Sequence, residues 1–382
     1  MKSWFGLAAA AAGAAALCGF GAQSALAGAR AVAAGTDEGT GHAVFVQTDN
    51  TAGNSVVAYD RAADGTLTKA ASYPTGGLGG VLAGSVVDHL ASQGSLTYDP
   101  SHRLLYAVNA GSNTVSVFSV HGDRLRLEQT AGSGGTFPVS VAVHDNHVEV
   151  LNALNGGSVQ GYLVVLGHLI PLPGSNRPLG LNPSATPQFT TTPGQVVFSP
   201  DGSRVIVTTK ANGNDIDVFR VGPLGYLSAA PVVNAEPGTV PFAVQFDRAG
   251  NLVVAEAGTN ALASFHLEAD GTLDPLASVP TGQAATCWVA AAGGRFYASN
   301  AGSATISAYQ SGPGGQLSLL GATSTDPGTV DAAATPDGRF LYVQTGAAGI
   351  VDAFAINPDG SLAELGTTLV PGSAGGEGIA AS

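Results

Sequence analysis

The sequence is poor in cysteine and in charge of either sign. Its 382 residues include two cysteines, and Asp, Glu, Lys and Arg together make up 11% of the chain. Cys18 lies in an N-terminal apolar run, so a chain that has lost this run keeps only Cys287. Such a chain cannot form an internal disulfide, and an exported protein would then depend on burial and hydrogen bonding for stability.

Positive charge is the scarcest kind. The formal net charge is -13, and Lys69 and Lys210 are the only lysines after residue 27. Nucleic acids and anionic membrane surfaces are bound by clustered Lys and Arg. We therefore expect neither as a partner, and instead a monomer that takes a small-molecule ligand.

Several catalytic and cofactor motifs are also missing. No Gly-rich loop precedes a helical pattern, and no Gly-x-Ser-x-Gly segment is present. His144 and His147 flank a predicted hairpin turn, which is too few ligands for a metal site. Cys287 lies in an apolar strand pattern typical of a protein core. We expect no cofactor and no metal.

The first 27 residues have the pattern of a secretory signal peptide. Lys2 gives a short positive start, residues 7–20 are apolar and rich in alanine, and Ala25-Leu26-Ala27 is a small-x-small cleavage motif. This predicts export, with a retained N-terminal anchor as the alternative. Residues 28–42 are expected to be a flexible segment, and residues 43–382 a single domain.

One pattern occurs seven times after this start: an apolar strand with an aromatic residue, a turn that usually contains Gly, and a second strand with Leu. Turns of this kind between alternating strands predict β-hairpins. The aromatic markers are Tyr59, Phe118, Tyr162, Phe219, Phe265, Tyr309 and Phe354.

The spacing of the markers predicts the architecture. Successive markers are 59, 44, 57, 46, 44 and 45 residues apart, which is the length of a four-stranded propeller blade. The first unit lacks an inner strand, and residues 376–382 have the pattern of one that is never continued. We therefore predict an all-β, seven-bladed β-propeller of four-stranded antiparallel blades, closed by the C-terminal strand pairing into blade one.

Propeller topology brings the starts of the inner strands and the ends of the second strands to one face of the ring. Convergent polar side chains at that channel mouth could form a ligand site. The alternative is that the asparagines only cap turns. The residues that we expect to bind substrate there are Gln93, Asn109, Asn152, Gln195, Asn300 and Asp331.

Lys210 and Glu256 are the candidate catalytic residues. They hold equivalent positions, at the ends of the second strands of blades four and five. Glu256 could activate water and Lys210 could stabilise an oxyanion. The alternative is an inter-blade salt bridge with little energetic value if exposed.

Segments 106–118 (YAVNAGSNTVSVF) and 297–309 (YASNAGSATISAY), together with the PDG hairpins and ADGTL turns, resemble the lactonase family of seven-bladed propellers. That family includes 6-phosphogluconolactonase and the carboxymuconate-lactonising cyclases. The resemblance matches Glu256 to a family glutamate. It also implies histidine and arginine at 192–195 and 240–243, which this sequence lacks, and an acidic residue at Lys210.

The absence of these histidine and arginine side chains disfavours a phosphorylated or polycarboxylate substrate, because phosphates and carboxylates are bound by fixed cations. The resemblance then implies a lactonase-like hydrolase acting on a small neutral lactone or ester at the channel mouth. Two alternatives stay open: a non-catalytic propeller that binds a ligand or protein, and a cyclase-like lyase. The long links at 75–94 and 174–194 are either lids of a site or covers for the side of the ring.

Overall fold

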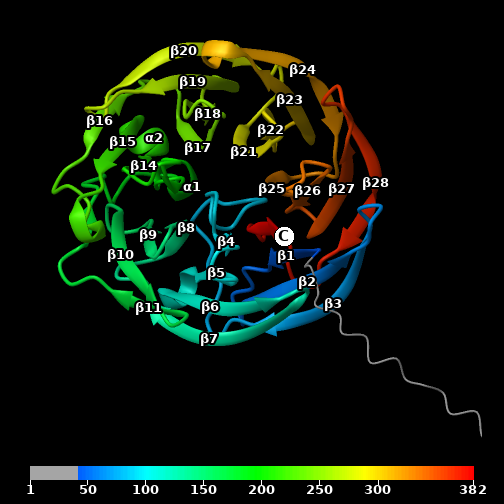
Figure 1. The fold of residues 1–382 in the computed structure, drawn as a ribbon, viewed down its shortest axis with the longest axis horizontal. Coiled ribbons are helices and arrows are strands. Elements are labelled where there is room, and N and C mark those ends of the chain that lie inside the picture. Colours follow the sequence, from blue (N-terminus) through cyan, green and yellow to red (C-terminus); the bar gives the residue numbers. More distant parts are fainter. Residues whose placement is uncertain (1–41) are drawn as a thin grey trace, which may run out of the picture. The chain divides into compact units, whose positions relative to one another are not determined.

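The computed structural model describes residues 42–382. The predicted signal peptide and nearly all of the segment 28–42 lie outside these residues. The described part forms seven antiparallel sheets arranged in a ring, as the sequence predicted (Figure 1). Each sheet is one blade of four strands, and a fifth, two-residue strand joins blade three.

We number the blades in chain order, with blade one built from β29, β1, β2 and β3. The innermost strands are β4 (Leu96–Asp99), β8 (Pro138–His144), β13 (Val196–Phe198), β17 (Pro241–Phe246), β21 (Thr286–Ala292), β25 (Thr329–Ala334) and β29 (Ile379–Ala381). The second strands are β1 (Ala43–Gln47), β5 (Leu104–Asn109), β9 (His147–Asn152), β14 (Arg204–Thr208), β18 (Leu252–Glu256), β22 (Arg295–Asn300) and β26 (Phe340–Thr345).

The third and fourth strands complete each blade. The third strands are β2 (Ser55–Arg61), β6 (Thr114–His121), β10 (Ser158–Val165), β15 (Asp215–Arg220), β19 (Ala261–Leu267), β23 (Thr305–Ser311) and β27 (Ile350–Ile356). The outermost strands are β3 (Leu67–Pro74), β7 (Arg124–Gly132), β11 (His168–Pro171), β16 (Val232–Ala235), β20 (Leu273–Pro280), β24 (Leu317–Ser324) and β28 (Leu362–Leu369).

The C-terminal strand closes the ring. β29 pairs antiparallel with β1, with Phe45 opposite Ala380. The N–H of Ser382 donates to the carbonyl of Ala43 at 2.9 Å. The prediction that the last residues supply the missing inner strand of blade one is confirmed, and this pairing covers the inner edge of β1.

The aromatic markers lie between neighbouring blades. All seven are at most 2% exposed. The hydroxyls of the three tyrosine markers donate to carbonyls on the outer part of the preceding blade: Tyr59 to Leu369, Tyr162 to Gly132 and Tyr309 to Val279. Each buried aromatic side chain contributes about 1.5–3 kcal/mol, and the hydroxyls keep their hydrogen bonds. The repeat therefore predicts the packing of the blades as well as their number.

Regular structure in the links is limited to short pieces. These are β12 (Arg177–Pro178), which pairs with β10, and the single helical turns α1 (Gln188–Thr191), α2 (Lys210–Gly213), η1 (Ala110–Ser112), η2 (Pro223–Gly225) and η3 (Pro313–Gly315). Within residues 42–382, no helix has the length and apolarity that crossing a membrane requires.

Candidate functional site

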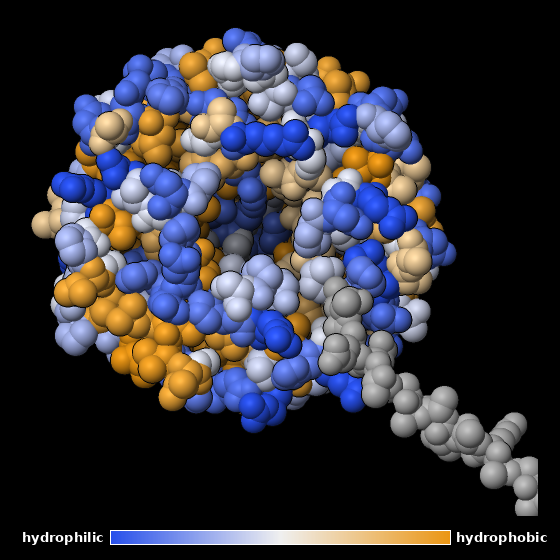
Figure 2. Space-filling view, viewed as in Figure 1, coloured by the Kyte–Doolittle hydropathy of each residue, from blue (hydrophilic) through white to orange (hydrophobic). Residues whose placement is uncertain are grey.

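The central channel has two different ends. At the strand-start end the innermost strands begin, and at the turn end they turn back into the second strands. In the space-filling view the centre of the ring is hollowed (Figure 2). The sequence placed the candidate site at the strand-start end, where the two long links also lie.

The first long link closes the strand-start end. Its residues 88–94, which we call the plug, cross the channel from blade two toward blade six. The side-chain amide of Gln93 makes two hydrogen bonds with the backbone of Val289, each 2.9 Å long. The indole N–H of Trp288 donates to the carbonyl of Ser92 at 2.5 Å, and Ser92 itself is fully buried. Gln93 therefore ties opposite sides of the ring together.

Polar residues begin the inner strands because their side chains accept hydrogen bonds from the inner strand of the next blade. We call this series of bonds from blade to blade the belt. The hydroxyl of Ser140 accepts a bond from the N–H of Val196 in the next blade, at 3.2 Å. The side-chain carbonyl of Gln195 accepts one from Val244 in the blade after that, at 2.6 Å. Innermost strands have one unpaired edge, and a buried unpaired N–H costs about 1–3 kcal/mol.

Blade five interrupts this belt. Its corresponding residue is Phe242, whose side chain cannot accept a hydrogen bond. The N–H of Val289 in blade six is bonded instead by Gln93 of the plug. The ring of Phe242 packs edge-on against Trp288, with the centroids 5.0 Å apart. The plug thus supplies the partner that blade five lacks.

Lys210 joins the two long links. Its ammonium donates to the carbonyls of Ala91 in the first link and Phe189 in the second, at 2.6 and 2.7 Å, and to the hydroxyl of Thr192 at 3.2 Å. It also lies 5.2 Å from the ring centroid of Phe242. Lys210 is 1% exposed, and this burial lowers its pKa to about 8 against the opposing effect of nearby negative charge.

Four buried carboxyl groups interact electrostatically with one another: Asp49, Asp88, Asp331 and Glu377. Two of them, Asp88 and Glu377, also interact with Lys210. Burial raises the pKa of Asp49 and of Asp331 to about 7. Burial and the charge of Asp88 raise the pKa of Glu377 well above its usual range. Glu377 accepts a hydrogen bond from the N–H of Ser92 at 2.9 Å, and is thus tied to the plug. Within residues 42–382, no group of His, Cys, Asp and Glu could hold a metal ion.

Glu256 has different surroundings from Lys210. Its carboxylate accepts hydrogen bonds from the hydroxyls of Thr259, at 2.9 Å, and Ser278, at 3.4 Å. Burial raises its pKa, and these two bonds oppose the rise. Within the described chain, no hydrogen bond or ion pair joins Glu256 to Lys210. The two candidate catalytic residues therefore each have their own partners.

The three candidate asparagines are fully buried and bonded to nearby backbone and side chains. The amide of Asn109 donates to the hydroxyls of Thr114 and Ser116. The amide of Asn300 donates in the same way to Thr305 and Ser307. Asn152 donates to the carbonyl of Ser133 at 3.0 Å. These contacts hold the turns and strands around each asparagine in place.

The turn end, in contrast, contains a chamber of about 600 Å³. Gln93, Gln195 and Asp331 line its inner end, beneath the plug, and its lining extends to the turns at Pro100 and Pro336. Three of the expected substrate-binding residues are therefore brought together here. Among the described residues that line the chamber, none is a lysine or an arginine.

Asp331 is the only carboxyl group among the described lining residues. One carboxylate oxygen accepts a hydrogen bond from the N–H of Ala332 at 2.9 Å, and a further bond comes from the backbone of Ile379. Its side chain is thereby fixed at the inner end of the chamber. With a pKa of about 7, it can accept or release a proton near neutral pH.

The sequence did not single out Gln245, which lines the chamber near the end of β17, or the plug residues Asp88 and Ser92. Gln245 could have been found from its place in an otherwise apolar inner strand. The plug residues carry no such signal, because their positions depend on how a long link crosses the channel. Cys287 is not a candidate nucleophile, because burial raises the pKa of its thiol to about 12.

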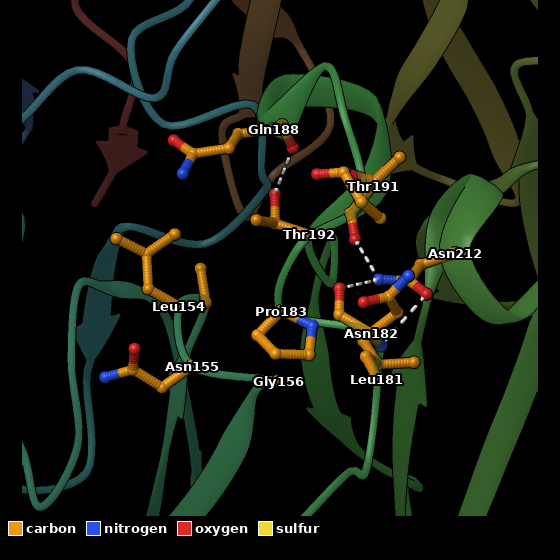
Figure 3. A pocket seen from close by; sticks show the side chains of 12 residues that line it. Leu154, Asn155, Gly156, Leu181, Asn182, Pro183, Gln188, Thr191, Thr192 and Asn212 are labelled. Carbon is orange, nitrogen blue, oxygen red and sulfur yellow. Dashed lines mark hydrogen bonds between the residues drawn. The ribbon is translucent and has the colours of Figure 1, made fainter.

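A second, much smaller hollow lies where the second long link meets blade three. Figure 3 shows Asn212 between Asn182 and Thr191, and its amide donates to both their carbonyls at 2.9 Å. The cavity there is about 20 Å³, which is room for little more than a water molecule. The hydrogen bonds of Asn212 anchor the link, and the cavity is too small for a substrate.

Comparison with known families adds to this geometry. Residues 256–377, which begin at the end of the second strand of blade five and include all of blades six and seven, match the family model described as lactonase, 7-bladed beta-propeller. These blades carry the lactonase-family signature. The resemblance predicted from the repeat motifs is thereby confirmed. A comparison with curated protein sequences finds no match.

Several solved structures share the fold of this chain. A provisionally assigned 6-phosphogluconolactonase from Bacteroides fragilis is 19% identical with a TM-score of 0.70, over 89% of this chain and 98% of its own. A periplasmic gluconolactonase from Pseudomonas aeruginosa is 21% identical with a TM-score of 0.67, over 88% of this chain and 98% of its own. A streptogramin B lyase is 15% identical with a TM-score of 0.55, over 78% of this chain and 89% of its own.

Proposed function

We propose that the protein is a lactonase-like hydrolase that opens a small neutral lactone or ester in the chamber at the turn end. The observation that supports this most is Asp331: a fixed carboxyl group with a pKa of about 7, at the inner end of a chamber of about 600 Å³. A general base works best when its pKa lies near the working pH.

The reaction would proceed by attack of water. Asp331 takes a proton from a water molecule while the water oxygen bonds to the lactone carbonyl carbon. The side-chain N–H groups of Gln195 and Gln245, which line the chamber, would stabilise the resulting oxyanion. Collapse of this intermediate breaks the ring C–O bond, and Asp331 returns the proton to the departing alkoxide. The product is an open hydroxy acid, which loses its own proton to solvent.

Family and charge both support this proposal. The lactonase-family match covers the outer half of blade five and all of blades six and seven, and one similar structure is named a periplasmic gluconolactonase. The chamber lining has no Lys or Arg among the described residues, which disfavours a phosphorylated or polycarboxylate substrate. The name of that structure is also compatible with export, which we propose from the signal-peptide pattern.

The test is hydrolysis of neutral lactones by the wild type and by Asp331→Asn and Glu256→Gln. We expect Asp331→Asn to lose turnover while Glu256→Gln keeps it. Loss of turnover in Glu256→Gln alone would instead support the catalytic pair proposed from the sequence. Circular dichroism of both variants would show whether the fold is retained.

A second candidate function is a propeller that binds a ligand or a protein without catalysis. The closed strand-start end supports it, since Lys210 and Glu256 have separate partners there. Binding of a neutral lactone without turnover, in a folded wild-type protein, would favour this candidate.

A further inference from the structure

We propose that the chamber selects uncharged lactones that carry an apolar substituent, with the ring beside Asp331 and the substituent directed toward the turn end. The proposal rests on the proposed function for the chemistry of the ring. It adds the class of substrate, which neither the fold nor the family match specifies.

The size of the chamber is the first argument. Its volume of about 600 Å³ lies in the middle of the range for sites that hold drug-sized ligands, about 300–1,000 Å³. A bare five- or six-membered lactone would leave most of this space to water. From Val141 to His144, both in the lining, β8 advances by three residues or ~10 Å, which leaves room for a substituent of several carbons.

The second argument is that several polar side chains in the chamber already have hydrogen-bond partners within the protein. Gln93 has both polar atoms bonded to Val289. The hydroxyl of Thr97 donates to the carbonyl of Val141 at 2.8 Å, and that of Ser199 to Asp201 at 2.6 Å. Such groups have little capacity left for a sugar, which needs a partner for each hydroxyl.

The third argument is the chemistry of the chamber's outer half. We name the residues around its opening the collar: Tyr98, Pro100, His144, Phe198, Pro200 and Pro336. The rings of His144 and Phe198 lie 5.7 Å apart, tilted by 36°. Small side chains also line the wall and leave space beside them: Ala291, next to the turn that follows β21, and Ala332, in the middle of β25. Aromatic, proline and alanine surfaces favour an apolar group over a charged or polyhydroxylated one.

The test compares ligands that differ only in their substituent, and it measures binding separately from turnover. The hydrolysis-resistant lactams of δ-valerolactone and δ-decalactone provide a bare ring and the same ring with a pentyl group. Calorimetry with wild-type protein should give a Kd at least tenfold lower for the pentyl lactam, since each buried methylene contributes up to about fourfold. D-Glucono-δ-lactone should be a poorer substrate than δ-decalactone.

Ala291→Trp provides the structural control. Ala291 is an exposed residue that lines the chamber, so a tryptophan there should occupy the space of the substituent without disturbing the core. Ala363→Trp, on the exposed side of the outer strand β28, is the matched control. We expect the advantage of the pentyl group to disappear in Ala291→Trp and to persist in Ala363→Trp, with both proteins unfolding at wild-type temperature.

The proposal would be overturned by equal Kd values for the two lactams, or by a preference for the sugar lactone. A pentyl preference that Ala291→Trp does not reduce would also contradict it, by placing the substituent elsewhere. A failure of hydrolysis is distinguishable from these results. If the pentyl lactam binds tightly and no lactone is turned over, the ligand class holds and the hydrolase function does not.

Discussion

The two ends of the channel use polar residues in different ways. At the strand-start end, the side chains of Gln93, Ser92 and Lys210 bond to backbone groups of the plug, of the second link or of other blades. At the turn end, Gln245 and Asp331 line an open chamber. The first end holds the ring together, and the second end has side chains left to meet a ligand.

This difference shows that convergent polar residues do not by themselves define a site. In a closed ring of sheets, each innermost strand has an unpaired edge, and a buried edge requires hydrogen-bond partners. Ser140 and Gln195 provide these partners for the next blade. Asp331 belongs to both ends, because it bonds to backbone N–H groups and also lines the chamber.

The largest effect that we predict separates the two ends by activity. Asp331→Asn should lower kcat on a neutral lactone by at least about 100-fold, because a general base contributes about 10²–10⁴-fold. Glu256→Gln should stay within about threefold of the wild type, because its carboxylate is bonded to Thr259 and Ser278. Steady-state kinetics measures both. Equal losses in the two variants would break the distinction between the ends.

Replacing Lys210 should lower the stability of the protein. Lys210→Met leaves the carbonyls of Ala91 and Phe189 without their donor, and we expect the free energy of unfolding to fall by about 3 kcal/mol. Lys69→Met, at an exposed position on β3, should change it by less than about 0.5 kcal/mol. Urea unfolding followed by fluorescence provides the comparison. A stable Lys210→Met variant would show that the links do not need this contact.

The bond across the channel should have a smaller effect. Gln93→Leu removes both hydrogen bonds to Val289, and we expect a loss of about 1–2 kcal/mol in urea unfolding. Gln310→Leu is the matched control on the third strand of blade six, because the amide of Gln310 also makes two hydrogen bonds to backbone groups, and it should cost less. If the two losses were equal, the tie between opposite blades would contribute nothing beyond ordinary hydrogen bonds.

Stability should also depend on pH. The pKa values of Asp49 and Asp331 are raised to about 7, so between pH 4 and 7 the folded state binds more protons than the unfolded state. Stability should therefore be highest below about pH 4 and should fall as the pH rises toward 7, by up to about 4 kcal/mol for each carboxyl, because each pKa is raised by about three units and one unit corresponds to about 1.4 kcal/mol. Asp331→Asn should flatten this slope. A stability that rises over this range would mean that these carboxyls are ionised in the folded protein.

The sequence predicted the blades well because the information is local and repeated. Each marker aromatic fixes one inter-blade contact, and the incomplete first unit pairs with residues 379–381 as expected. It predicted the candidate site less well. The convergence of Gln93, Gln195 and Asp331 followed from strand order, but the partners of Gln93 depend on a long link that crosses the ring. No local pattern specifies the path of such a link.

The most direct test of the account is a crystal structure of the protein with a hydrolysis-resistant lactam bound. We predict the ring of the lactam in the chamber beneath the plug, with its carbonyl near Gln195 and Gln245 and its ring next to Asp331. A lactam bound on the strand-start side of the plug, between Lys210 and Glu256, would contradict the account. It would show that the two links open to admit a ligand.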